Sequence, residues 1–241
     1  MNEKPHLLRV YDDVLGQLRA DVGSICHITV RNLQAVTDGL RANQVDPCLR
    51  AIADDEEVNA LEKAIDARGI EILTRFQPVA SDLRFVMAAM RVATNLERIS
   101  DEAKSIGRRG RNLIESGFHW EPERLAALFG MAGAELAAAL RAFLEGDMAA
   151  AHGVRPQDKA LDASHKECIA RISSAMATRP EATNHFVALL LIVRSLERIG
   201  DHAKNIAEEA IFLSEARDVR HPKSRLPDDG AAPTSDRNRP G

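Results

Sequence analysis

The 241-residue chain is poor in aromatic residues and has few cysteines. Phe, Trp and Tyr together make up 4% of it, and no window shows sustained alternation of apolar and polar residues. Because strands favour aromatic and β-branched residues in such alternation, we expect no β-sheet. The three cysteines, Cys26, Cys48 and Cys168, form no CxxC pair. An odd number of separate cysteines indicates small buried thiols in a reducing compartment rather than a disulfide framework.

Long apolar runs and an excess of positive charge are also missing. The longest apolar run, Phe186–Val193, has eight residues, whereas a membrane span needs about 20. The N-terminal segment MNEKPHLLRVYDDV carries charges where a signal peptide is apolar. The net charge of -4 argues against non-specific binding to nucleic acid. The sequence therefore predicts a cytoplasmic protein that neither inserts into a membrane nor binds nucleic acid.

Common enzyme signatures are absent as well. The chain contains no GxxxxGK[ST], GxGxxG or GxSxG motif, which excludes the usual nucleotide-binding loops and the nucleophile elbow. Di-iron oxidases built on helix bundles need Glu-x-x-His on two helices. The single Glu-x-x-His here, Glu3–His6, is interrupted by Pro5. We therefore predict that the protein is not an enzyme.

Helical periodicity dominates what is present. Apolar residues from Ala89 to Ile106 recur at alternating steps of three and four, the pattern of a bundle helix. Gly, Pro and capping residues mark the ends of six expected helices. The first runs from about Pro5 to Asn43 before Asp46-Pro47, the second ends at Gln77-Pro78, and the third runs from Ser81 or Asp82 to Gly107 or Gly110. The others span about Pro122 to Leu144, from the break at Glu145-Gly146-Asp147 to Thr178, and from the break at Arg179-Pro180 to Ala216.

One sequence segment occurs twice in nearly the same form. LERISDEAKSI begins at Leu96 and LERIGDHAKNI begins 100 residues later, at Leu196. A fixed-period repeat indicates a duplicated structural unit. We therefore predict an all-α fold of two tandem three-helix bundles, at residues 1–115 and 116–217. Residues 218–241 contain four prolines and almost no large apolar side chain, which predicts a disordered tail.

Each copy of the repeat carries an acidic pair, Glu97 with Asp101 and Glu197 with Asp201. Residues four apart share one face of a helix, and 100° per residue turns this face away from the apolar stripe. The preceding helix of each unit carries a second stripe. It consists of Asp55, Asn59, Glu62 and Asp66 in the first unit, and the equivalent positions in the second unit are Asp158, Asp162, His165 and Ile169.

Two interpretations of these stripes are open. Carboxylates and amides on adjacent helices supply several oxygens, the donor set of a hard cation such as Mg²⁺ or Mn²⁺, and iron or Zn²⁺ is also chemically reasonable. Alternatively, the acids form ordinary surface ion pairs with neighbouring cations such as Lys104 and Lys204. Like charges four residues apart are mildly destabilising, so the repeated pairing favours a cation that offsets them.

Four segments resemble the PhoU family: DEEVNALEKAID, QPVASDLR, NLERISDEAKSI and SLERIGDHAKNIAEE. The similarity extends from about Leu7 to Leu213. It implies two three-helix bundles with surface metal clusters, of iron or zinc in family members. Carried over residue by residue, the implied ligands are Glu62, Asp66, Glu97 and Asp101 in the first bundle, and Asp158, Asp162, Glu197 and Asp201 in the second. Ser100 and Glu102 depart from the family's usual Gly and His, which the second copy retains as Gly200 and His202.

The resemblance also implies a cytoplasmic negative regulator of phosphate uptake and phosphate signalling. Its implied partners are the ATPase subunit of the phosphate ABC transporter and the phosphate-sensing histidine kinase, and many members form homodimers. A metal-dependent helical-bundle enzyme and a metal-free scaffold are the alternatives for the same surface. The basic segment Arg108-Arg109-Gly110-Arg111 is expected to lie at a helix C-terminus, where the macrodipole favours cations, and a contact with nucleic acid or phosphate is the alternative.

Overall fold

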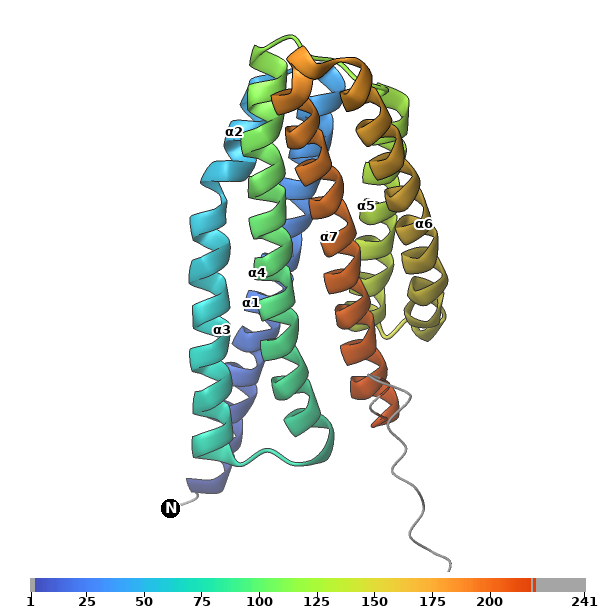
Figure 1. Ribbon diagram of the computed structural model, residues 1–241. Coiled ribbons are helices and arrows are strands. Elements are labelled where there is room, and N and C mark those ends of the chain that lie inside the picture. Colours follow the sequence, from blue (N-terminus) through green and yellow to red (C-terminus); the bar gives the residue numbers. More distant parts are fainter. Residues whose placement is uncertain (1–2, 218, 220–241) are drawn as a thin grey trace, which may run out of the picture.

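The computed structural model describes residues 3–217 and 219, and within them the chain is helical with no strand (Figure 1). The all-α prediction is confirmed. The helices are α1 (Glu3–Ala42), α2 (Val45–Ala53), α3 (Asp55–Phe76), α4 (Ala80–Glu115), α5 (Pro122–Glu145), α6 (Met148–Thr178) and α7 (Thr183–Glu215), with a short 3-10 helix at Pro180–Ala182 before α7.

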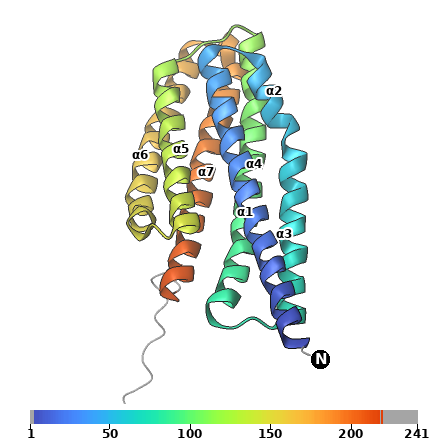
Figure 2. The same ribbon diagram turned by 180° about the vertical axis from the view of Figure 1, so that it is seen from behind.

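The helices form two tandem bundles, as predicted. α1, α3 and α4 make the first, with the short α2 packed against α1 and α4, and α5, α6 and α7 make the second. The antiparallel α4 and α7 share the most extensive contact and join the bundles, while α1 also meets α5 on the opposite side (Figures 1 and 2). The boundary predicted at residues 115 and 116 stays a prediction. The predicted disordered tail lies outside the described residues except for residue 219.

Two predictions about helix ends are wrong. The second helix is divided at Asp54 into α2 and α3, so the described residues form one α-helix more than expected. The chain leaves α1 at Asn43, whose φ is 54°, and Pro47 lies in the first turn of α2, where its missing N–H has no helical partner to lose. The third expected helix does not end at Gly107 or Gly110 but continues to Glu115.

Gly107 marks a close approach between helices rather than a helix end. A Cβ atom at this position would lie 3.0 Å from the backbone carbonyl oxygen of Cys48 and 3.3 Å from the side chains of Ile52 and Val36. Because a backbone carbonyl cannot move alone, a side chain here would push α2 away from α4. The absence of a side chain therefore lets the short helix α2 lie directly on α4.

Gly107→Ala is expected to lower the free energy of unfolding by about 1–2 kcal/mol, because overpacking against α2 outweighs the gain in helix propensity. Gly130→Ala in α5 is the matched control, since nothing lies within 4 Å of its Cβ position. The control should raise stability by about 0.5–1 kcal/mol. Urea denaturation of both variants measures the two values, and a stabilised Gly107→Ala protein would show that α2 moves freely.

The predicted apolar stripe is buried as expected. Leu96, Ile99, Ala103 and Ile106 have no exposed surface, and neither have their counterparts Leu196, Ile199, Ala203 and Ile206. The three cysteines are free and buried, which confirms their prediction as small buried thiols. Burial raises the pKa of the Cys26 thiol to about 12, so this group stays protonated at neutral pH.

α5 is long and apolar enough to cross a membrane by length and composition, although the chain has no long unbroken apolar run. Of the most apolar 18-residue window of α5, 56% is buried inside the protein. This buried part packs against α1, α6 and α7. In this fold α5 therefore serves as the core helix of the second bundle.

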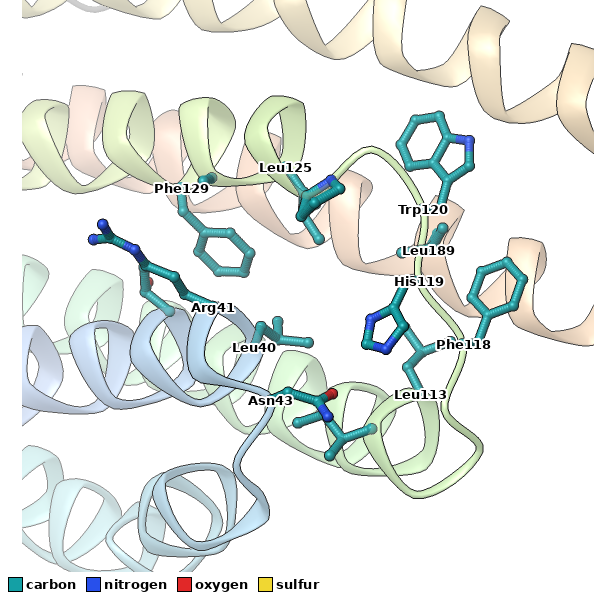
Figure 3. A pocket seen from close by; sticks show the side chains of 14 residues that line it. Leu40, Arg41, Asn43, Leu113, Phe118, His119, Trp120, Leu125, Phe129 and Leu189 are labelled. Carbon is teal, nitrogen blue, oxygen red and sulfur yellow. The ribbon is translucent and has the colours of Figure 1, made fainter.

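The connector between α4 and α5, residues 116–121, closes one end of the molecule. The Phe118 ring stacks on His185 at 4.7 Å and meets Phe186 edge-on at 5.3 Å. Leu40 of α1 and Phe129 of α5 line an apolar pocket of about 100 Å³ beside the connector (Figure 3). These contacts tie the connector to both bundles.

Candidate functional site

The register between α3 and α4 brings their polar stripes together. Along the antiparallel pair, Lys104 contacts Asp55, Thr94 donates to Glu62, and the Cβ position of Gly69 faces the Met90 side chain. The two residues of each successive pair lie closer together along the chain as the helices approach their connection. The predicted acids of the first bundle therefore lie along one face formed by two adjacent helices.

The first acid set consists of Asp55, Glu62, Glu97 and Asp101. Burial raises the pKa of the Glu97 carboxyl, and the nearby carboxylates of Asp101, Glu62 and Asp55 raise it further against the opposing effect of Arg98. Of the four predicted ligands, Glu62 and Asp101 thus lie close enough to Glu97 to raise its pKa, and Asp55 has the same effect. The register places the fourth, Asp66, farther along α3, between the levels of Thr94 and Met90.

A lysine neutralises this first set. The Lys104 ammonium lies 2.5 Å from the Asp55 carboxylate and 3.7 Å from that of Asp101. The Asp55 side chain is only 3% exposed and that of Lys104 22%. The pair of Lys104 with Asp101 is the surface ion pair that the sequence allowed, since the Asp101 side chain is 56% exposed. The pair of Lys104 with Asp55 is different, because the Asp55 carboxylate is largely removed from water and needs a counter-charge.

The second acid set consists of Asp158, Asp162, Glu197 and Asp201, and all four were predicted. Lys204 donates to Asp158 at 3.0 Å and to Asp201 at 2.7 Å, so it repeats the role of Lys104. Burial raises the pKa of the Glu197 carboxyl. The Asp201 and Asp162 carboxylates raise it further, whereas His165 lowers it.

Beneath the second set lies a residue that the sequence analysis missed. Glu135 of α5 has no exposed surface, and neither carboxylate oxygen has a hydrogen-bond partner among the described residues. Burial raises its pKa to about 8, and the carboxylates of Asp158, Asp201 and Asp162 add to this effect while Lys204 opposes it. The alanine-rich sequence around Glu135 does not indicate that this glutamate is buried, because its burial depends on which helices cover α5.

The two copies of the repeat differ at Ser100 and Gly200, and each residue has a structural reason. In the first bundle the buried Asn32 amide donates to the Ser100 hydroxyl at 3.4 Å. In the second, Glu135 lies beside Gly200, where a Cβ atom would be 3.1 Å from its carboxylate and 2.5 Å from the Leu161 side chain. Gly200 therefore leaves room for Glu135.

The two copies of the repeat also differ at Glu102 and His202. Both residues lie at the contact between the bundles rather than in either acid set. Glu102 forms an ion pair with Arg198 of α7 at 2.6 Å. His202 contacts the Asn95 side chain of α4 at 3.1 Å. Burial lowers the pKa of the His202 imidazole, and the cations Arg98 and Arg198 lower it further. The polar contact between α4 and α7 is therefore asymmetric although the two helices are repeats.

Within the described part of the chain, no three His, Cys, Asp or Glu side chains converge closely enough to hold a metal ion. The two acid sets are instead arranged around the lysine ammonium groups described above. The donors are nevertheless of one chemical kind, since carboxylate oxygens suit hard cations. The assignment of the eight acids as metal ligands stays a prediction.

Comparisons with known proteins agree with the duplicated architecture. The family model described as "PhoU domain" matches residues 22–110 and 125–210, one match in each bundle. The phosphate-specific transport system accessory protein PhoU homolog of Pseudomonas aeruginosa is 35% identical over 208 residues, covering 80% of this chain and 85% of that protein. The homolog of Caulobacter vibrioides is 32% identical, with 92% and 96% coverage respectively.

A solved structure shows the same fold. The crystal structure of PhoU from Pseudomonas aeruginosa superposes with a TM-score of 0.83 at 29% identity, covering 86% of this chain and all of that one. The domain matches, the identity along most of the chain and the shared architecture all point to one assignment. The chain belongs to the PhoU family.

Proposed function

We propose that this protein is a cytoplasmic negative regulator of phosphate uptake and phosphate signalling, rather than an enzyme. The observation that carries the proposal is the 35% identity, over 80% of the chain, to an accessory protein of the phosphate-specific transport system. The chain combines this identity with a PhoU domain in each bundle. Its partners would be the ATPase subunit of the phosphate ABC transporter and the phosphate-sensing histidine kinase, bound by a homodimer of this chain.

The proposed cofactors are divalent or iron-type metal ions, with iron or zinc favoured over magnesium or manganese. Their ligands would come from Glu62, Asp66, Glu97 and Asp101 in the first bundle, and from Asp158, Asp162, Glu197 and Asp201 in the second. The donor set fits such ions, because several carboxylates gathered on adjacent helices repel one another and favour a counter-charge. A bound cation would supply that charge in place of the lysines and brace the two helices.

Metal content tests this part of the proposal. The untagged full chain is stripped with a chelator, incubated separately with Fe²⁺, Zn²⁺, Mn²⁺ and Mg²⁺, desalted and assayed for metal bound per chain. We expect retention of iron or zinc, with less in Glu97→Ala/Asp101→Ala and Glu197→Ala/Asp201→Ala. Glu56→Ala/Glu57→Ala is a matched control, because both residues are exposed at the start of α3. Retention that is equal in all variants would remove the assignment of these ligands.

Association tests the regulatory role separately from metal binding. The purified chain is mixed with the transporter ATPase subunit or with the cytoplasmic part of the sensor kinase, with and without metal. We expect a complex with at least one of them, and light scattering should give the mass of a dimer for the free chain. Failure to associate with either partner in every metal state would contradict the regulatory role. Metal-dependent turnover that disappears in Glu197→Ala would favour an enzyme instead.

A further inference from the structure

Ten residues of α4 and α7 line a polar groove. The two helices lie side by side in the half of the molecule nearer the connector (Figure 1). The volume of the groove is about 470 Å³. Five of the side chains that line it are cationic: Lys104, Arg108 and Arg109 of α4, and Arg194 and Arg198 of α7. Asp101 and Glu102 are its only acidic lining residues. A chain with a net charge of -4 thus concentrates positive charge at the seam between its bundles.

Both acidic side chains of the groove are already paired. Glu102 forms its ion pair with Arg198 at 2.6 Å, and Asp101 lies 3.7 Å from Lys104. The guanidinium groups of Arg108, Arg109 and Arg194 form no ion pair with a carboxylate in the described part of the chain, although Arg194 lowers the pKa of Glu197, one turn along α7. Arg109 donates to the backbone oxygen of Ser105 at 2.9 Å, which holds its side chain against α4 without neutralising its charge.

The position of these arginines excludes the explanation expected from the sequence. Arg108 and Arg109 do not lie at a helix C-terminus, because α4 continues to Glu115 and its last turn contains no basic residue. The helix macrodipole acts only within the last turn, so it gives no reason for cations here. The antiparallel register, in which Glu102 faces Arg198 and Asn95 faces His202, brings them instead opposite Leu191 and Arg194 of α7.

The chemistry of the lining favours a small anion over a protein segment. Leu191 is the one apolar side chain among the ten lining residues, whereas protein interfaces depend on buried apolar and aromatic anchors. Guanidinium groups present planar pairs of donors that match the oxygens of phosphoryl groups. From Leu191 to Arg198 the groove follows two turns of α7, roughly 10 Å, which is longer than a single phosphate.

We propose that the groove between α4 and α7 binds a small anion with linked phosphoryl groups, such as a free di- or triphosphate or the phosphate chain of a nucleotide. Arg108 and Arg194 contact it from opposite walls, and Arg109 adds a third charge. The inference does not rest on the proposed regulatory role, because it uses residues of the groove alone. Anion binding and transporter association can therefore fail independently of each other.

Isothermal titration calorimetry on the full chain tests the proposal, in metal-free buffer with 150 mM salt as a fixed condition. The probes are orthophosphate, pyrophosphate, tripolyphosphate, ATP and sulfate. We expect tripolyphosphate to bind with one site per chain and orthophosphate to bind at least tenfold more weakly. Binding of ATP as tight as that of tripolyphosphate would identify the phosphate chain of a nucleotide as the ligand. Weaker binding of ATP would identify a free oligophosphate.

Variants show whether the groove is the site. Arg108→Ala/Arg194→Ala should weaken tripolyphosphate binding at least tenfold, and both residues are exposed, so the fold should be retained. Arg9→Ala/Arg50→Ala removes the same charge from exposed positions outside the groove and should change affinity less than twofold. Equal loss in both double variants would reveal general charge attraction and overturn the proposal. So would the absence of binding by any phosphate probe, the result expected if an acidic protein segment occupies the groove.

Discussion

Glu135→Gln is expected to raise the free energy of unfolding at pH 9 by about 3–5 kcal/mol and to leave it nearly unchanged at pH 4. Burial raises the pKa of this carboxyl to about 8 in the folded chain, from 4.5 for a glutamate in water. Folding therefore takes up a proton between these two values. Stability falls by about 1.4 kcal/mol for each pH unit as the pH rises from 4.5 to 8, and the loss is complete above 8.

Glutamine keeps the shape of the protonated side chain and cannot ionise, so it removes this pH dependence. Urea denaturation at pH 4, 6, 7.5 and 9, with a chelator present, compares the variant with the parent chain. Glu145→Gln is the matched control, because Glu145 is an exposed residue at the end of the same helix. Other titrating groups cancel in the difference between the two proteins. A difference that does not grow with pH would show that Glu135 is already ionised or has an unrecognised partner.

Lys104→Met is expected to lower the free energy of unfolding at pH 7 by about 3–5 kcal/mol. Methionine fills much of the lysine's volume but leaves the Asp55 carboxylate, only 3% exposed, without its counter-charge. Removing one partner of a buried pair exposes the full cost of desolvating the other. Lys204→Met should cost somewhat less, because the side chain of its partner Asp158 is 12% exposed and more accessible to water.

The same variants connect stability with the proposed metal sites. A divalent cation can replace the lost positive charge, so added Mn²⁺ should restore part of the stability of Lys104→Met, measured by thermal or urea unfolding. The control is Lys63→Met, which removes an exposed lysine of α3 and should change stability by less than about 0.5 kcal/mol. Destabilisation without any recovery in Mn²⁺ would argue against a cation site in the first acid set.

The acid sets show why one part of the candidate site could be anticipated and another could not. Glu97 and Asp101 share a face because they are four residues apart on one helix, and this geometry is local. Their separation from the apolar stripe of Leu96 and Ile99 follows from the same rotation per residue. Which residue of α3 lies opposite them depends on the register between helices, so Asp55 enters the set while Asp66 lies farther along.

The two bundles also differ in ways that their shared repeat hides. In the first bundle α1 places Asn32 beside Ser100, and in the second bundle the equivalent helix α5 places Glu135 beside Gly200. Asn32 and Ser100 form a neutral hydrogen bond, whereas the buried Glu135 carboxyl has no hydrogen-bond partner among the residues that the structure describes. The repeated motif LERI(S/G)D is the same length in both copies, yet the environment beneath it is set by a helix far away in the chain. A duplicated sequence thus produced two unlike interiors.

The sequence by itself determined the helical class, the division into two bundles, the buried stripes and the pairing of the outward acids. Each of these follows from spacing along one helix or from the repeat itself. Only the tertiary structure decided that Lys104 reaches Asp55 and that Lys204 reaches Asp158, that Glu135 is buried, and that the α4 arginines face those of α7. These arrangements bring together residues 46 to 86 positions apart, from the ion pair of Asp158 with Lys204 to Arg108 and Arg194, which line the same groove. They depend on how whole helices pack, which no local periodicity records.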